Sequence, residues 1–255
     1  MKLFYLLVIF FSNGFDFPQK NTADIQSTVE SPNSNAYWAT LLMPRNPYPI
    51  QQDSTSYPKS KERIREIRSI LKKEYERGTV SMDSVQLVFT DNLVNSLIPY
   101  WYGTRWSFEG HTEIPMVGEV ACGYFVSTTL RDMGLKLNRY KLAQKSPIDE
   151  AKVISCGTDI FIVEDIEPKK AIAKIDAATS EGIYFIGYDS GHVGYLMKKN
   201  GELFLIHSNY LSPYSVSMET LKDSKVFQSF TKFYLVDVTY NVTMMERWLN
   251  NTIIQ

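Results

Sequence analysis

Cys122 is the residue of this chain best placed to act as a nucleophile. It lies in residues 119–132, whose apolar side chains recur at helical spacing, so we expect its thiol in the first turn of a buried helix. A helix N-terminus lowers the pKa of a thiol, and its backbone N–H groups can hold a developing oxyanion. Gly123 follows and leaves one flank of the sulfur open. The alternative is a small buried hydrophobe, the commonest fate of a free cysteine.

The general base of any Cys/His enzyme built on this chain must come from three histidines. His192 begins a predicted strand, and His207 ends the next strand. Asn-Gly at 200–201 is typical of a tight hairpin between them, and paired strands lie about 4.8 Å apart. We therefore expect His207 to fix the tautomer of His192 and to leave its other nitrogen for the thiol. The alternative is two unrelated polar residues near strand ends.

The remaining cysteine and histidine have simpler interpretations. Cys156 has no histidine near it in the sequence, and we expect it to be structural. The two cysteines could pair in an oxidising compartment, but two do not make a disulfide framework. No cysteine or histidine has zinc-ligand spacing, so we expect no metal and no cofactor. His111, in the loop before the nucleophile, is expected at the surface.

The elements that position these residues change in kind along the chain. Helical patterns come first, and short alternating strands separated by turns come later, which predicts an α+β domain. The predicted helices are 59–77, 81–98 (closed by Pro99), 119–132, 168–178 and 241–249, and the predicted strands are 159–163, 183–188, 192–197, 202–207 and 233–238.

The N-terminal residues predict an exported protein. Lys2 precedes nine apolar residues, too few to span a bilayer but typical of a secretory signal peptide, which we assign to residues 1–14. The alternative is a buried strand. Residues 15–58 are rich in Ser, Asn, Gln, Thr and Pro and are interpreted as a linker, followed by one catalytic domain over 59–255. We expect a periplasmic or secreted monomer with no stable membrane span after signal removal.

Composition argues against nucleic-acid binding. The formal net charge is −1, charged residues make up 22% of the chain, and no stretch forms a basic tract. Hydrophobic residues at 44% are ordinary for a globular domain.

Four motifs together resemble the NlpC/P60 superfamily of cysteine peptidases and amidases. Residues 99–104 (PYWYGT) and 121–126 (ACGYFV) are similar to its aromatic-glycine segment and its Asp-Cys-Ser-Gly-Phe-Val motif. Residues 192–196 (HVGYL) and 204–207 (FLIH) are similar to its two histidine strands. No single motif is specific to the family, but the occurrence of all four in the family's order is a more specific signal. The resemblance covers residues 96–210, a little under half of the chain.

The resemblance implies a papain-like α+β fold, in which the cysteine helix packs on an antiparallel sheet that carries the histidines. It implies an amidase or endopeptidase acting on a peptide or peptidoglycan fragment, with Cys122 as nucleophile, His192 as base and His207 orienting that base. It also places the hydroxyl of Tyr100 near the thiol. The other residues expected at the substrate are Tyr102, Trp106, Gly123, Ser190 and Gly191.

The sequence departs from the family beside the sulfur itself. Ala121 replaces the usual Asp, Gly123-Tyr124 replaces Ser-Gly, and residues 135–180 are longer than the family core needs. These departures favour a divergent branch and bear on the substrate more than on the catalytic residues. They also leave two alternatives open, a catalytically inactive binding module and an acyltransferase on the same scaffold.

Overall fold

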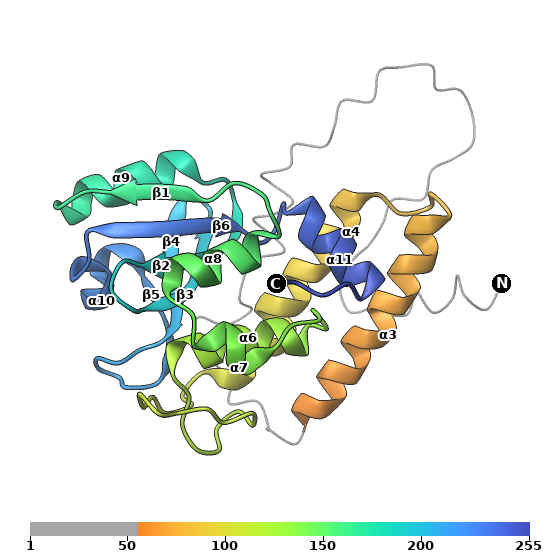
Figure 1. Ribbon diagram of the computed structural model, residues 1–255, viewed down its shortest axis with the longest axis horizontal. Coiled ribbons are helices and arrows are strands. Elements are labelled where there is room, and N and C mark those ends of the chain that lie inside the picture. Colours follow the sequence, from red (N-terminus) through yellow and green to blue (C-terminus); the bar gives the residue numbers. More distant parts are fainter. Residues whose placement is uncertain (1–55) are drawn as a thin grey trace. The chain divides into compact units, whose positions relative to one another are not determined.

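The computed structural model describes residues 56–255 (Figure 1). The predicted signal peptide and the part of the predicted linker before residue 56 lie outside the described residues. The first helix of the described residues, α3 (Tyr57–Glu76), begins two residues before the predicted start. Within residues 56–255, no helix is both long enough and apolar enough to cross a membrane.

An antiparallel sheet of six strands organises the described residues, and the α+β class is confirmed. Its order is β1-β6-β2-β3-β4-β5, and every neighbouring pair is antiparallel. The strands are β1 (Phe161–Glu164), β2 (Gly182–Tyr188), β3 (Val193–Lys199), β4 (Glu202–Ser208), β5 (Val216–Thr220) and β6 (Lys232–Asp237). The predicted Asn-Gly turn joins β3 to β4, with positive φ at both residues, as a type I′ hairpin requires.

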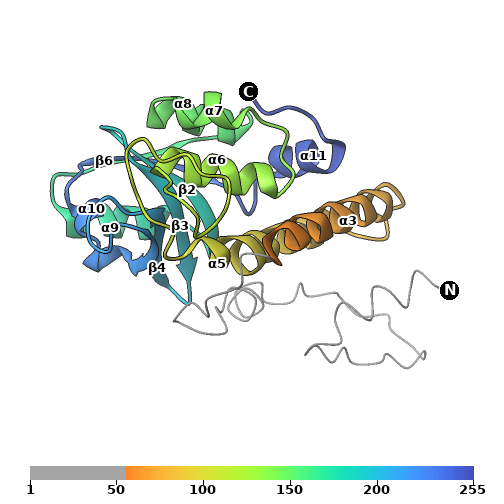
Figure 2. The same ribbon diagram turned by 90° about the horizontal axis from the view of Figure 1, so that it is seen from below.

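Helices cover both faces of the sheet (Figure 2). On one face, α6 (Cys122–Asp132) places Phe125, Val126 and Leu130 against Phe185 and Tyr195 of the sheet. On the other face, α9 (Pro168–Ala178) and α10 (Lys225–Gln228) pack on a separate apolar cluster that includes Tyr188 and Leu205. Because strand side chains alternate between faces, the four inner strands β6, β2, β3 and β4 contribute to both clusters.

The helix predicted over 81–98 has a more complex structure. It consists of α4 (Met82–Asp91), a π-helical segment η2 (Asn92–Leu97) and α5 (Ile98–Trp101). The prediction that Pro99 closes the helix is wrong, because the chain stays helical to Trp101. Pro99 lies in the first turn of α5, where a residue without an N–H group loses no helical hydrogen bond.

Several elements were not predicted. These are α7 (Arg139–Ala143), α8 (Pro147–Ser155), the 3-10 turn η3 (Leu221–Asp223), α10 and the edge strand β5. Strand β5 alternates apolar Val216 and Met218 with polar Ser217 and Glu219, a pattern that could have revealed it. The last helix, α11 (Val242–Asn250), agrees closely with its prediction.

Candidate active site

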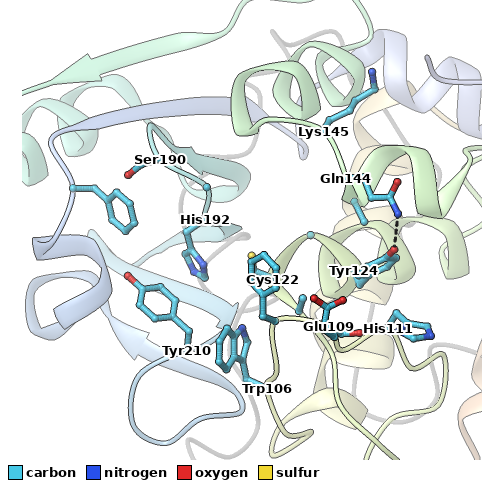
Figure 3. Close-up of a pocket in the computed structure, with 16 residues that line it drawn as sticks. Trp106, Glu109, His111, Cys122, Tyr124, Gln144, Lys145, Ser190, His192 and Tyr210 are labelled. Atoms are coloured by element: carbon cyan, nitrogen blue, oxygen red, sulfur yellow. Dashed lines mark hydrogen bonds between the residues drawn. The ribbon is translucent and has the colours of Figure 1, made fainter.

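An open pocket of about 700 Å³ lies between the start of α6 and the start of β3 (Figure 3). Cys122 and His192 both line it, and Figure 3 shows their side chains next to each other. The other lining residues are Trp106, Phe108, Glu109, His111, Ala121, Gly123, Tyr124, Ala143, Gln144, Lys145, Ser190, Gly191, Tyr210 and Phe230. The structure therefore brings the predicted nucleophile and the predicted base into one pocket.

The Cys122 thiol lies at the N-terminus of α6, as the sequence predicts. Backbone N–H groups of Val193 and Gly123 hydrogen-bond to the sulfur. Val193 directly follows His192, so this contact ties the nucleophile to the strand that carries the base. Ala121 is the N-cap of α6, and no side chain caps the helix there, because alanine has no acceptor oxygen.

The two strand histidines are joined as predicted. Nε2 of His192 lies 2.8 Å from Nδ1 of His207, and both rings are buried. Nδ1 of His192 is therefore the nitrogen that remains for the thiol. His207 needs space beside β3, and Gly194 provides it: a Cβ atom there would lie 2.9 Å from Cβ of His207.

Glu219 of β5 extends the chain of contacts and was missed by sequence reasoning. Its Oε1 lies 3.1 Å from Nε2 of His207, and Ser224 also hydrogen-bonds to the carboxylate. Burial raises the pKa of Glu219, but the hydrogen bonds from His207 and Ser224 outweigh it, and the pKa lies below its usual value. The carboxylate is therefore ionised at neutral pH.

The electrostatics of the thiol differ from the expectation. Burial raises the pKa of Cys122 to about 11, and the hydrogen bonds from Val193 and Gly123 offset this only in part. Burial, with a smaller contribution from His207, also lowers the pKa of His192 well below its usual value. The backbone N–H groups at the helix terminus do lower the thiol pKa, but desolvation is the larger effect, so the expectation of a net lowering is wrong. At neutral pH the resting pair is a neutral thiol beside a neutral imidazole.

Glu150 of α8 is a second buried carboxyl close to this pair. Its side chain is 1% exposed, and its Oε1 has no hydrogen-bond partner among the described residues. Burial raises the pKa of Glu150 well above its usual value and so favours the neutral acid. A negative charge on Glu150 is one of the causes that raise the pKa of Cys122. Keeping Glu150 neutral therefore favours thiolate formation.

Gly123 has a packing role that the sequence did not predict. A Cβ atom at this position would lie 2.6 Å from the carbonyl oxygen of Ala143, so the glycine permits α6 to approach the end of α7. The residue also borders the pocket, so this packing is a second reason for glycine at this position.

Two predicted residues lie outside the pocket. The hydroxyl of Tyr100 bonds to Oγ of Ser56 and Ser60, at 2.8 and 3.0 Å, and not to the thiol. The hydroxyl of Tyr102 lies against the sulfur of Met218. The expectation for Tyr100 is incorrect, because α5 continues through Pro99 and turns the ring toward α3.

Trp106, Ser190 and Gly191 do line the pocket, as expected. Trp106 reaches it because residues 103–106 are hydrogen-bonded to residues 214–216, at the start of β5. The turn before β3 brings Ser190 and Gly191 to the opposite rim. Tyr210, which sequence reasoning missed, places its ring 5.2 Å from that of His192.

The rim near His111 is held by a buried arginine. The Arg139 guanidinium packs against the rings of both Tyr124 and Tyr140 and donates to the carbonyls of His111 and Thr112. His111 is exposed, as expected, but it also borders the pocket.

Cys122 and Cys156 are both free thiols. Cys156 ends α8 with a positive φ of 55° and is buried, away from the pocket. Among residues 56–255, no three His, Cys, Asp or Glu side chains form a potential metal site.

Comparisons with known proteins leave the family open. A scan against protein-family models finds no match, and searches of curated proteins and of solved structures find none either. The resemblance to the NlpC/P60 superfamily stays a prediction based on the four motifs.

Proposed function

We propose that this chain is a cysteine hydrolase that cleaves an amide or peptide bond through a thioester acyl-enzyme. One observation carries the proposal. The thiol at the start of α6 bonds to the backbone N–H of Val193 and shares a pocket with His192, whose far nitrogen is held by buried His207. A nucleophile, a base and a group that orients the base are the parts that such catalysis needs.

The neutral resting pair defines the first step. Nδ1 of His192 accepts the thiol proton as the sulfur attacks the substrate carbonyl, so that the thiolate never forms alone in a buried site. The carbonyl oxygen becomes an oxyanion, and backbone N–H groups at the start of α6 can stabilise it. His192, now an imidazolium, carries the proton that the leaving group needs.

The second half of the reaction reverses the roles. His192 gives its proton to the leaving amine, and the acyl group remains on Cys122 as a thioester. A water molecule, deprotonated by His192, then attacks the thioester carbonyl. The acid is released, and the proton returns to the thiolate.

For the substrate and the family, we propose a cell-wall peptide and a divergent, papain-like NlpC/P60 member. The four motifs support the family, and a cysteine helix packed on an antiparallel sheet that carries both histidines is compatible with its fold. Export, predicted from residues 1–14, would bring the enzyme to peptidoglycan.

The test is hydrolysis of peptides cut from purified peptidoglycan, followed by mass spectrometry of the products. Cys122→Ala should lower the rate by at least about 10³-fold and leave the fold intact. Cys156→Ala is the matched control and should retain activity. Full activity in Cys122→Ala would refute the proposal.

Two observations favour a second candidate, a binding module that is catalytically inactive. The thiol pKa of about 11 and the uncapped Ala121 are both unlike an activated nucleophile. Such a module would bind the same peptides equally well with and without Cys122, and neither the original protein nor Cys122→Ala would release a product.

A third candidate is an acyltransferase on the same scaffold. Incubation with an added amine separates hydrolysis from acyl transfer, because a transferase would form a new amide.

A further inference from the structure

A continuous line of hydrogen bonds runs from His192 in the pocket through buried His207 to the partly buried carboxylate of Glu219. Nε2 of His192 lies 2.8 Å from Nδ1 of His207, and Nε2 of His207 lies 3.1 Å from Oε1 of Glu219. Each of these two bonds requires one N–H donor and one acceptor. Two directions are therefore possible, and only one of them suits a base that must accept a proton from the thiol.

The end of this line determines its direction. An ionised carboxylate can only accept hydrogen bonds, so Nε2 of His207 must carry a hydrogen. His207 is buried, which lowers its pKa and keeps the ring neutral, and a neutral imidazole carries a single N–H. Nδ1 of His207 is then an acceptor and requires an N–H on Nε2 of His192. Neutral His192 is left with a bare Nδ1 for the thiol.

We propose that Glu219 is a positioning residue that sets the direction of this line, so that His192 presents a proton acceptor to Cys122. The role of these tautomers in catalysis rests on the proposed function. The tautomers themselves are properties of the protein and do not depend on any substrate.

The surroundings of Glu219 support this role. Glu219 pairs with Leu205, two residues before His207, so both polar side chains project from the same face of the sheet. Ser224, the buried N-cap of α10, hydrogen-bonds to the carboxylate from above that face. His207 is fully buried between these groups, unlike a partner in a surface ion pair.

A direct test is the tautomer of each histidine, measured by NMR of the protein with ¹⁵N-labelled imidazole rings. The chain has only three histidines, and His111→Gln and His207→Gln complete the assignment. In the unaltered protein we expect His192 and His207 to carry hydrogen on Nε2. If His207 of the unaltered protein instead carries its hydrogen on Nδ1, the proposal is overturned, and no variant is needed to show this.

The isosteric variant Glu219→Gln removes the constraint, because an amide can donate as well as accept. We expect a measurable population of His207 and His192 to switch their hydrogen to Nδ1. Asp223→Asn removes an equal charge from a neighbouring, exposed carboxylate and should leave both tautomers unchanged. Identical tautomers in Glu219→Gln, in a protein with an otherwise unchanged spectrum, would also overturn the proposal.

Activity supplies a second readout once a substrate is known. Glu219→Gln should lower kcat by about tenfold and change KM by less than about twofold, because the change reaches the base and not the bound substrate. Asp223→Asn should keep kcat within about twofold. If the protein proves not to be a hydrolase, the NMR measurement of the tautomers still applies. The proposed function and the proposed role of Glu219 can therefore be refuted independently.

Discussion

Nε2 of His192 lies 2.8 Å from Nδ1 of His207, although fifteen residues separate the two histidines in the sequence. The hairpin turn at Asn200-Gly201 and the absence of a side chain at Gly194 together make this contact possible. As a result, Nδ1 of His192 is the nitrogen available to the Cys122 thiol.

Alkylation of Cys122 should show the raised thiol pKa. In a Cys156→Ala background, the rate with iodoacetamide should still be rising above pH 9, because burial raises the thiol pKa to about 11 and only the thiolate reacts. A small thiol peptide, with a pKa near 8.5, is the reference. A rate that is already constant at pH 7 would instead indicate a thiolate–imidazolium pair at rest.

Gly194→Ala should displace His207. The new Cβ would lie 2.9 Å from both Cβ of His207 and the carbonyl oxygen of Ile206, and such overpacking costs about 1–3 kcal/mol. We expect a lower free energy of unfolding in urea and a fall in kcat. Gly201→Ala is the control on the same hairpin: its positive φ of 73° also makes alanine unfavourable, but nothing lies within 4 Å. An equal loss of kcat in the control would show that general weakening of the hairpin is responsible.

Glu150→Gln should change how stability depends on pH. Because the folded-state pKa of Glu150 is raised, the unfolded chain ionises first as the pH rises above about 4.3, and the folded protein loses about 1.4 kcal/mol per pH unit up to its own pKa. The variant lacks this loss. Its free energy of unfolding, relative to the original protein, should therefore increase between pH 4 and pH 7.

Asp149→Asn, on the same helix, is the matched control for Glu150. The pKa of exposed Asp149 is lowered, chiefly by its hydrogen bond with Lys152, so its contribution is present at neutral pH and is lost as the pH falls. The variant should therefore lose stability at neutral pH, and this deficit should shrink on acidification. A pH trend of the same sign in both variants would contradict the assignment of Glu150 as a neutral buried acid.

Tyr100→Phe should affect stability and not catalysis. The hydroxyl bonds to two serines of the α3 region, and removing it should cost about 1 kcal/mol in urea unfolding. Because Tyr100 does not line the pocket, kcat should stay within about twofold. A large fall in kcat at unchanged stability would restore the expectation that Tyr100 acts at the thiol.

The local sequence pattern was sufficient to predict several features of this protein. The apolar period around Cys122 placed the thiol at a helix start, and the Asn-Gly turn paired the strands of His192 and His207. These predictions succeeded because helix periodicity and hairpin turns are set by neighbours in the chain. The α+β class followed from the same signals.

Other features depended on groups brought together from distant parts of the chain. Glu219 meets His207 through the pairing of β5 with β4, and Glu150 approaches Cys122 only after α8 packs on the sheet. The hydroxyl of Tyr100 bonds to Ser56 and Ser60 at the start of α3, a contact across about 40 residues that no local pattern revealed. Sequence determined which residues could perform cysteine chemistry. The tertiary structure decided their charge states, because burial and hydrogen bonding, rather than position along the chain, set the pKa values of Cys122, His192 and Glu219.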